Sequence, residues 1–272
     1  MTERVALLTG AAGGLGACAA HYLAERGWRV FAADVDAERL AALGGVERIH
    51  PLVMDVTDQE SISAALHEVE AQAGGLDGLV NLAGTIALSS MIEMDEATLF
   101  RVLNTNALGV YRVNRTFFPL VLKRRGRIVN ISSETGWQSG GPFNGAYAMS
   151  KHAIEAYSDS LRRELSFLGV PVIKVQPGPI KTRMVSCLPE MLASTIERST
   201  YFREVLTRMQ ALIPREYERA NHPLLVAKAV HKTLTAVRPK ACYSVRPDFR
   251  RALLERMPAR WADAVVKKVL GG

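Results

Sequence analysis

Short apolar runs alternate with helical stretches along most of the chain, and no other feature of the sequence constrains the fold as strongly. Turn residues bound the runs, and the stretches between them repeat apolar residues at helical spacing. Strands are predicted at 5–8, 30–33, 49–53, 79–82, 127–131 and 172–175, with an edge strand at 242–245. Short buried strands separated by amphipathic helices predict an α/β fold with a parallel, doubly wound sheet and helices on both faces.

The whole chain, residues 1–272, is interpreted as one domain, because no linker, repeat or low-complexity segment interrupts it. Within this domain we expect a helical insertion at about 183–222 and a basic extension over 240–272. The helical region from about 95 to 123 is expected to bend near Gly109.

The composition argues against several classes of protein. The net charge is +7, from 34 Lys and Arg against 27 Asp and Glu, but no nucleic-acid-binding motif accompanies it, so no such partner is expected. Cys18, Cys187 and Cys242 are far apart, so neither a disulfide framework nor a metal site is indicated. No apolar run approaches the roughly 20 residues of a membrane span, and residues 5–8 read as a strand, not a targeting segment. A cytoplasmic location is therefore expected.

A glycine-rich loop follows the first predicted strand. Gly10, Gly14 and Gly16 lie between that strand and a helix, where a backbone without side chains lets a pyrophosphate approach a helix N-terminus. The spacing is G-x-x-x-G-x-G, and the same glycines would also suit a tight turn.

Asp34 ends the second strand, 18 residues after Gly16. A carboxylate there can accept hydrogen bonds from the adenosine ribose and would repel the extra phosphate of NADP. Neither Val35 nor Gly13 supplies a cation. These residues favour NAD over NADP, and the alternative for Asp34 is a solvated loop acid.

Polar residues and glycines also follow later strands. Asp55 could accept a bond from the adenine amino group with Val56 beside the ring, or it could cap a helix. Asn81 could bridge strands, while Gly84 would let the backbone approach a ribose. Thr182 ends a proline-rich loop and could bond a carboxamide, unless the loop is an ordinary connection.

Tyr147 and Lys151 are four residues apart in a predicted helix, so both side chains lie on one face. A nearby cation stabilises phenolate, so we expect the pKa of Tyr147 to fall below its usual value of about 10 and suit it to acid–base work. Ser132 and Ser133 end the preceding strand, where open α/β sheets bind ligands. The alternative is an ordinary snorkelling pair.

Asn106 lies inside a predicted helix, where asparagine is unfavourable. Its amide could use a local bend to hold a water near Lys151, or it could bond the neighbouring backbone.

Over about residues 3–240 these segments together resemble the short-chain dehydrogenase/reductase family. The motifs are Thr9–Gly16, Asn81–Gly84, Asn106, Ser133, Tyr147 with Lys151, and Pro177–Thr182. The resemblance implies a Rossmann-type sheet and nicotinamide chemistry. The segment Lys151–Thr182 is most similar to the retinol, steroid and hydroxybutyrate dehydrogenase-like subgroup.

The resemblance also implies roles for individual residues. Tyr147 would be the general acid/base, Lys151 would lower its pKa and hold the nicotinamide ribose, Ser133 would orient the substrate oxygen, and Asn106 would support a water in a proton relay. Cofactor contacts are implied for Gly10, Gly14, Leu15, Gly16, Asp34, Asp55, Val56, Asn81, Ala83, Gly84, Tyr147, Lys151, Pro177, Gly178, Ile180 and Thr182.

The serine departs from the family pattern, which usually separates it from the tyrosine by 13 residues. Here Ser133 precedes Tyr147 by 14 residues and Ser132 by 15. The extra residue is placed in the 136–142 loop, and Ser133 is favoured over Ser132. Glu134 would have the usual spacing, but a carboxylate is a poor neutral donor, so we reject it.

The predicted insertion carries many apolar residues that could line a pocket for a lipophilic alcohol. They are Met184, Leu188, Met191, Leu192, Ile196, Tyr201, Phe202, Leu206 and Met209, with Trp137 and Phe143 as further aromatic wall. The substrate is therefore predicted to be a hydrophobic secondary alcohol or ketone, such as a steroid, retinoid or fatty alcohol. A small hydroxy acid such as 3-hydroxybutyrate is the alternative, with Arg183 or Arg203 binding its carboxylate.

The basic extension has an apolar face on each of two predicted helices, around Leu253 and Val265. It could lie on a membrane surface, but a tail folded over its own substrate cleft or over a neighbouring subunit is favoured. The family resemblance suggests a homodimer or homotetramer through the helices at about 95–123 and 147–168. A non-enzymatic NAD-sensing regulator on the same fold is a rival that the presence of Tyr147 and Lys151 disfavours.

Overall fold

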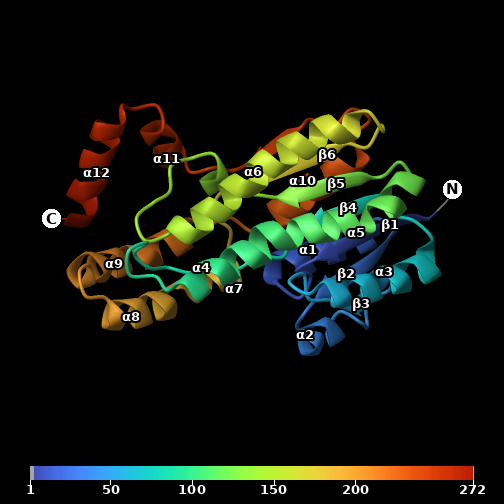
Figure 1. Ribbon diagram of the computed structural model, residues 1–272, viewed down its shortest axis with the longest axis horizontal. Helices are drawn as coiled ribbons and strands as arrows, with labels where there is room; N and C mark the ends of the chain where they lie inside the picture. The colour runs from blue at the N-terminus through green and yellow to red at the C-terminus, as the bar shows by residue number, and fades with distance from the viewer. Residues whose placement is uncertain (1–2, 272) are drawn as a thin grey trace.

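The computed structural model describes residues 3–271, apart from the side chains at 215 and 216. Seven parallel strands form one sheet in the order β3-β2-β1-β4-β5-β6-β7, which confirms the predicted doubly wound α/β sheet (Figure 1). The strands are β1 (Arg4–Thr9), β2 (Trp28–Asp34), β3 (Ile49–Val53), β4 (Gly78–Asn81), β5 (Arg127–Ile131), β6 (Val172–Pro177) and β7 (Cys242–Val245). The edge strand β7 pairs with β6 only at Lys174–Pro177.

The helices lie on both sides of this sheet (Figure 1). They are α1 (Gly14–Ala24), α2 (Ala37–Ala41), α3 (Gln59–Ala73), α4 (Glu96–Leu103), α5 (Gly109–Lys123), α6 (Gly145–Ser166), α7 (Arg183–Ser186), α8 (Leu188–Arg198), α9 (Arg203–Arg219), α10 (Leu224–Thr235), α11 (Phe249–Leu254) and α12 (Ala259–Gly271). The short α2, which starts at its cap Asp36, was not predicted from the sequence.

Successive residues of a strand point to opposite faces of the sheet, and this alternation makes two cores. In β1, Ala6 and Leu8 are fully buried against α1 and α10. Their neighbours Val5 and Leu7 are buried with residues of α3 and α5 on the other face. Both faces are covered, which explains why the strands read as continuous apolar runs.

The predicted bend near Gly109 is a change of helix type. Between α4 and α5, residues Asn104–Leu108 form one turn of π-helix, and Asn106 is fully buried within it. π-Helical turns of this kind occur often at functional sites.

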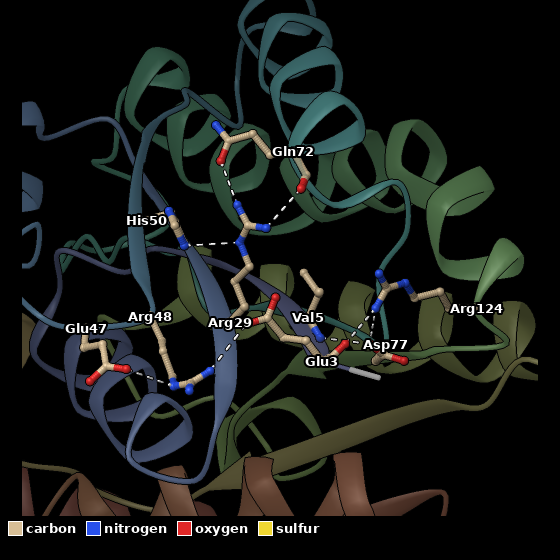
Figure 2. Close-up of polar contacts among 9 residues, drawn as sticks. All are labelled: Glu3, Val5, Arg29, Glu47, Arg48, His50, Gln72, Asp77 and Arg124. Atoms are coloured by element: carbon tan, nitrogen blue, oxygen red, sulfur yellow. Dashed lines mark hydrogen bonds and ion pairs between the residues drawn. The ribbon is translucent and has the colours of Figure 1, made fainter. Parts of the chain in front are cut away.

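Polar side chains form hydrogen bonds at the amino edge of the sheet, where the strands begin (Figure 2). Asp77 accepts hydrogen bonds from the Val5 amide at 2.8 Å and from the Arg124 guanidinium at 2.9 Å. Arg124 also donates to the Glu3 carbonyl at 3.0 Å. Nearby, Arg29 donates to the carbonyl and the side chain of Gln72. These groups satisfy one another.

The insertion and the C-terminal helices gather at the end of the molecule away from the N-terminus (Figure 1). Helices α8 and α9 pack on each other around a small core that includes Leu88, Leu192, Leu206 and Ile213. Helices α11 and α12 stand off the sheet, and Arg208 of α9 donates to carbonyls at the end of α12. Over residues 3–271, no helix has the length and apolar character needed to cross a bilayer.

Candidate active site

The glycine loop between β1 and α1 has two kinds of glycine. Gly10 has φ +69°, and a side chain at Gly16 would overlap the Gly10 carbonyl, so the turn itself requires both glycines. Gly14 is different, because a Cβ there would meet no atom within 4 Å. The first turn of α1 therefore opens onto free space, as a site for a pyrophosphate requires. Leu15 packs its side chain against the core beside α1.

Asp34 leaves the end of β2 and turns towards this loop. Its Oδ2 accepts a hydrogen bond from the Ala12 amide at 2.9 Å, and its Oδ1 accepts one from the Asp36 amide at 3.1 Å. Val35 beside it is exposed. The carboxylate thus stands beside the glycine loop, instead of lying in solvent as the alternative reading had it.

Asp55 and Val56 follow β3. Asp55 Oδ1 accepts bonds from the amide and the hydroxyl of Thr57, so Asp55 closes a local turn. The cap of α3 is Asp58, which accepts from the Glu60 amide at 2.9 Å. The cap alternative for Asp55 is therefore wrong. Val56 is buried and lies against Gly109.

Asn81 bridges strands, as one reading of the sequence predicted. Its Nδ2 donates to Asn130 of β5 at 2.9 Å and to Asn114 of α5 at 2.7 Å, and Asn130 donates in turn to Ser158. Sequence reasoning missed Asn114, Asn130 and Ser158. An asparagine inside an otherwise apolar strand was the available signal for Asn130, since buried amides are usually paired.

Gly84 and Asn106 lie beside Lys151. A Cβ at Gly84 would be 3.4 Å from Asn106 Oδ1 and 3.9 Å from Lys151 Nζ. Asn106 Oδ1 accepts from the Thr85 amide at 2.7 Å, while Nδ2 donates to the Thr85 carbonyl and to Ser150. Bonds within the chain thus engage both ends of this amide. Gly10 packs against the backbone of Ala83, and the Ala83 amide donates to Thr9 at 3.2 Å.

The two serines at the end of β5 have different surroundings. Ser133 hydrogen-bonds to the Tyr147 phenol, and its Oγ accepts from the Thr135 amide at 3.2 Å. Ser132 Oγ is buried against Gly136, with no hydrogen-bond partner among residues 3–271. Only Ser133 of the two is thus bonded to the tyrosine in the described chain.

Lys151 lies on α6 one turn after Tyr147. Its Nζ donates to the Ile131 carbonyl at 2.9 Å and lies 5.5 Å from the centroid of the Tyr147 ring. Burial lowers the pKa of Lys151 to about 8, against a smaller raising effect of Glu155.

The expected fall in the pKa of Tyr147 does not occur in this chain. Burial raises the pKa of Tyr147, the hydrogen bond from Ser133 lowers it, Glu134 raises it and Arg251 lowers it. Because the pKa of Lys151 is the lower of the two, the ammonium loses its proton before the phenol does. Spacing placed the two groups correctly, but burial decides the direction of the pKa shift.

The loop after β6 contacts the C-terminal part of the chain. The Gly178 amide donates to the Val245 carbonyl at 2.9 Å, and Ile180 bridges to Asn221. Pro177 ends β6 and is buried, whereas Thr182 is half-buried at the start of α7. These residues lie at the carboxyl edge of the sheet together with the glycine loop.

Part of the predicted pocket lining is structural. Leu192 and Leu206 are fully buried in the core of the insertion, and Phe143 packs on Phe202 with 5.5 Å between ring centroids. Tyr201 is exposed. The insertion therefore uses several of its apolar residues to hold its own helices together.

The chain was then compared with known proteins. A family model described as short chain dehydrogenase matches residues 4–193. Retinol dehydrogenase 7 of Rattus norvegicus is 34% identical over 285 residues, which cover 98% of this chain and 88% of that protein. The 17-beta-hydroxysteroid dehydrogenase type 6 of Homo sapiens is 32% identical, with 98% and 89% covered.

A solved structure supports the fold. A short-chain dehydrogenase from Streptomyces avermitilis superposes with a TM-score of 0.79 at 24% identity, over 98% of this chain and 97% of that one. The glycine loop, the serine–tyrosine–lysine arrangement, the family model and the two dehydrogenase relatives together show that the chain belongs to the short-chain dehydrogenase/reductase family, whose members are oxidoreductases that use a nicotinamide cofactor.

Proposed function

We propose that this chain is an NAD-dependent dehydrogenase that interconverts a hydrophobic secondary alcohol and the matching ketone. The observation that carries the proposal is the meeting of three side chains at the carboxyl end of β5, where Ser133 faces the Tyr147 phenol and Lys151 Nζ lies 5.5 Å from the Tyr147 ring. A substrate oxygen placed between the two hydroxyls would be oriented and exchange its proton in one geometry.

Each residue then has a distinct task. Tyr147 accepts the hydroxyl proton during oxidation and returns one during reduction. Ser133 orients the substrate oxygen and stabilises the phenolate through its hydrogen bond. Lys151 is charged near neutral pH, where it would hold the ribose of the cofactor, and Asn106 supports the backbone beside it. When bound, the nicotinamide supplies the hydride chemistry.

The preference for NAD rests on Asp34. Its carboxylate lies at the glycine loop, where it would accept hydrogen bonds from ribose hydroxyls and repel a 2′-phosphate. Asp34→Ala should weaken NAD binding and narrow the preference for NAD over NADP. Equal use of both cofactors by the unchanged protein would contradict this part of the proposal.

The proposed substrate class is lipophilic. The relatives described above are named for retinol and for a hydroxysteroid, and helices α8 and α9 of the insertion carry apolar side chains that pack with Phe143, on the loop before α6. Activity confined to small hydroxy acids, with Arg183 or Arg203 as the carboxylate partner, would exclude a lipophilic substrate.

A panel of secondary alcohols assayed with NAD tests the proposal, and Tyr147→Phe is the decisive variant. Removing the phenol should lower turnover by about 1,000-fold, within the range for a general acid–base group, while the dissociation constant of NAD changes little. Tyr111→Phe, at a half-exposed tyrosine on α5, is the matched control and should keep full turnover. Turnover of Tyr147→Phe near that of the unchanged protein would reject the assignment, and a chain that binds NAD without turning over any alcohol would favour the regulator alternative.

We also propose that the chain forms a homodimer or homotetramer through α4–α5 and α6. Large apolar side chains on these helices are exposed, among them Phe100, Leu122 and Met149. Light scattering on the purified protein should give a multiple of the 29.8 kDa chain mass, and Phe100→Asp should reduce it. A monomer at micromolar concentration would contradict this arrangement.

A further inference from the structure

A carboxylate is buried directly beside the serine that bonds Tyr147. Glu134 begins a short 3-10 turn, Glu134–Gly136, and its side chain is only 3% exposed. Burying a carboxylate is costly unless hydrogen bonds and opposite charge compensate it. Its place next to Ser133 therefore calls for an explanation that the proton transfer itself does not supply.

Part of the compensation for burying Glu134 comes from the basic C-terminal extension, residues 240–272, which lies more than 100 residues later in the chain. Glu134 Oε2 accepts a hydrogen bond from the Asp248 amide at 2.7 Å. Its Oε1 lies 3.3 Å from Nη1 of Arg251 on α11. The extension thus supplies both a backbone donor and a positive charge to the turn that follows Ser133.

Two further contacts fix the same extension. Glu255 accepts from the amide and the hydroxyl of Ser139, at 2.8 and 3.0 Å. On the other side, Gly178 lies directly against the carbonyl of Arg246, so that a side chain at Gly178 would overlap it. The extension therefore touches the loop after β5, which leads into α6 and Tyr147, and the loop after β6.

The pair also lies within electrostatic reach of the phenol. Glu134 raises the pKa of Tyr147 and Arg251 lowers it. Among the described residues, Ser133 of the loop after β5 and Lys151 of α6 also face this phenol. A change of charge at Arg251 on α11 therefore shifts the pKa of Tyr147, although the two residues are far apart in the sequence.

We propose that Glu134 and Arg251 are a positioning pair. Through this pair the C-terminal extension holds the loop after β5, which carries Ser133, in place against Tyr147. The effect of this pair on catalysis rests on the proposed function. The contact between the loop after β5 and the C-terminal extension does not. Neither residue is assigned contact with the substrate. The geometry makes the C-terminal extension a working part of the site, not an appendage.

Amide hydrogen exchange on the chain without substrate tests the link between the segments. Arg251→Gln and Glu134→Gln should each raise exchange in residues 246–256 and in residues 133–139 by about tenfold, because both partners lose the same contact. Arg251→Lys keeps the charge and should restore part of the protection. Arg256→Gln, at an exposed arginine on the same extension, is the matched control and should leave exchange unchanged.

The pH dependence of alcohol oxidation tests the link to Tyr147. Arg251→Gln removes a positive charge, so the rise of kcat/KM should move to higher pH by about half a unit, and Glu134→Gln should move it to lower pH. A purely structural role would lower kcat/KM in both variants without opposite movements of the profile, and this result would overturn the proposal.

The partly exposed Arg251 keeps the test valid if Glu134→Gln fails to fold, because substituting a side chain that is 34% exposed threatens folding less. Exchange and profile in Arg251→Gln equal to those of Arg256→Gln would overturn the proposal on their own. If Tyr147→Phe disproves the proposed function, the exchange of the two segments still decides whether the pair links them.

Discussion

The amino edge of the sheet, where the strands begin, and the carboxyl edge, where they end, use polar residues in opposite ways. At the amino edge, Asp77 and Arg124 bond each other, and both also bond backbone groups of the first strand region (Figure 2). At the carboxyl edge, Gly14 opens onto free space, and a hydroxyl pair, Ser133 and Tyr147, stands next to a buried cation. At the amino edge the polar groups bond one another and the backbone, whereas at the carboxyl edge the space beside the polar groups can take a ligand.

The difference also appears in the free energy of folding. The pair of Asp77 and Arg124 is about one-third exposed, which limits both the desolvation cost and the stabilisation. Lys151 is 6% exposed, and the lowering of its pKa shows that its charge is held at a cost. We infer that the buried charge of Lys151 lowers the free energy of unfolding and is kept because the reaction needs it, as is common in active sites. Three substitutions test this contrast, and two of them have a matched control.

Ser133→Ala should have the largest effect. The hydroxyl that bonds Tyr147 is lost, and turnover should fall by about 100-fold, as for other groups that stabilise charge in the transition state. Steady-state kinetics at saturating NAD and a lipophilic alcohol measure this loss.

Ser132→Ala is the matched control, one residue away. Its hydroxyl is buried without a hydrogen-bond partner in the described chain, so its removal should keep turnover within about twofold and leave stability equal or higher. The reverse pattern, with turnover lost only in Ser132→Ala, would transfer the substrate role to Ser132.

Lys151→Met should separate stability from activity. At pH 7 the variant should bind NAD more weakly but unfold at a higher denaturant concentration, with a free energy of unfolding that is higher by about 2 kcal/mol. A pKa lowered from 10.5 to about 8 corresponds to a charge penalty of about 3 kcal/mol, and the lost hydrogen bond to the Ile131 carbonyl offsets about 1 kcal/mol of the gain.

The same shift predicts the pH dependence. Between pH 8 and 10.5 the unfolded chain binds the Lys151 proton and the folded chain does not, so this group makes the unchanged protein more stable as the pH rises. The advantage of Lys151→Met should therefore be full below pH 8 and shrink towards pH 10. An unfolding free energy of the variant below that of the unchanged protein at pH 7 would contradict the inferred cost.

These contrasts separate what the sequence could predict from what it could not. Strand positions follow from local patterns, and β3, β5 and β7 have the predicted bounds because short apolar runs between turn residues depend little on distant contacts. The glycine loop, Tyr147 and Lys151 also carry local signals. The direction of the tyrosine pKa shift was wrong, because burial depends on the packing of the whole site.

Glu134 shows the limit most clearly. We rejected it as a substrate donor because it is a carboxylate, and no local pattern indicates another task. Its contacts at Asp248 and Arg251 come from a segment more than 100 residues away. The partners of the buried amides of Asn114 and Asn130 were missed for the same reason, since these partners lie on other elements. Pairings between distant segments require the folded chain.

Arg124→Gln should have the smallest effect and completes the contrast at the amino edge. The variant loses the ion pair with Asp77 and the bonds to the Glu3 and Ala73 carbonyls, which are partly exposed, so the free energy of unfolding should fall by about 1 kcal/mol. Arg125→Gln, at the exposed neighbouring residue, should change it by less than about 0.5 kcal/mol. Turnover and NAD binding should stay unchanged in both variants, because the substitutions lie at the opposite edge from Ser133 and Tyr147. A fall in kcat with unchanged stability in Arg124→Gln would show instead that the amino edge influences the chemistry, and the two edges would no longer be separable in function.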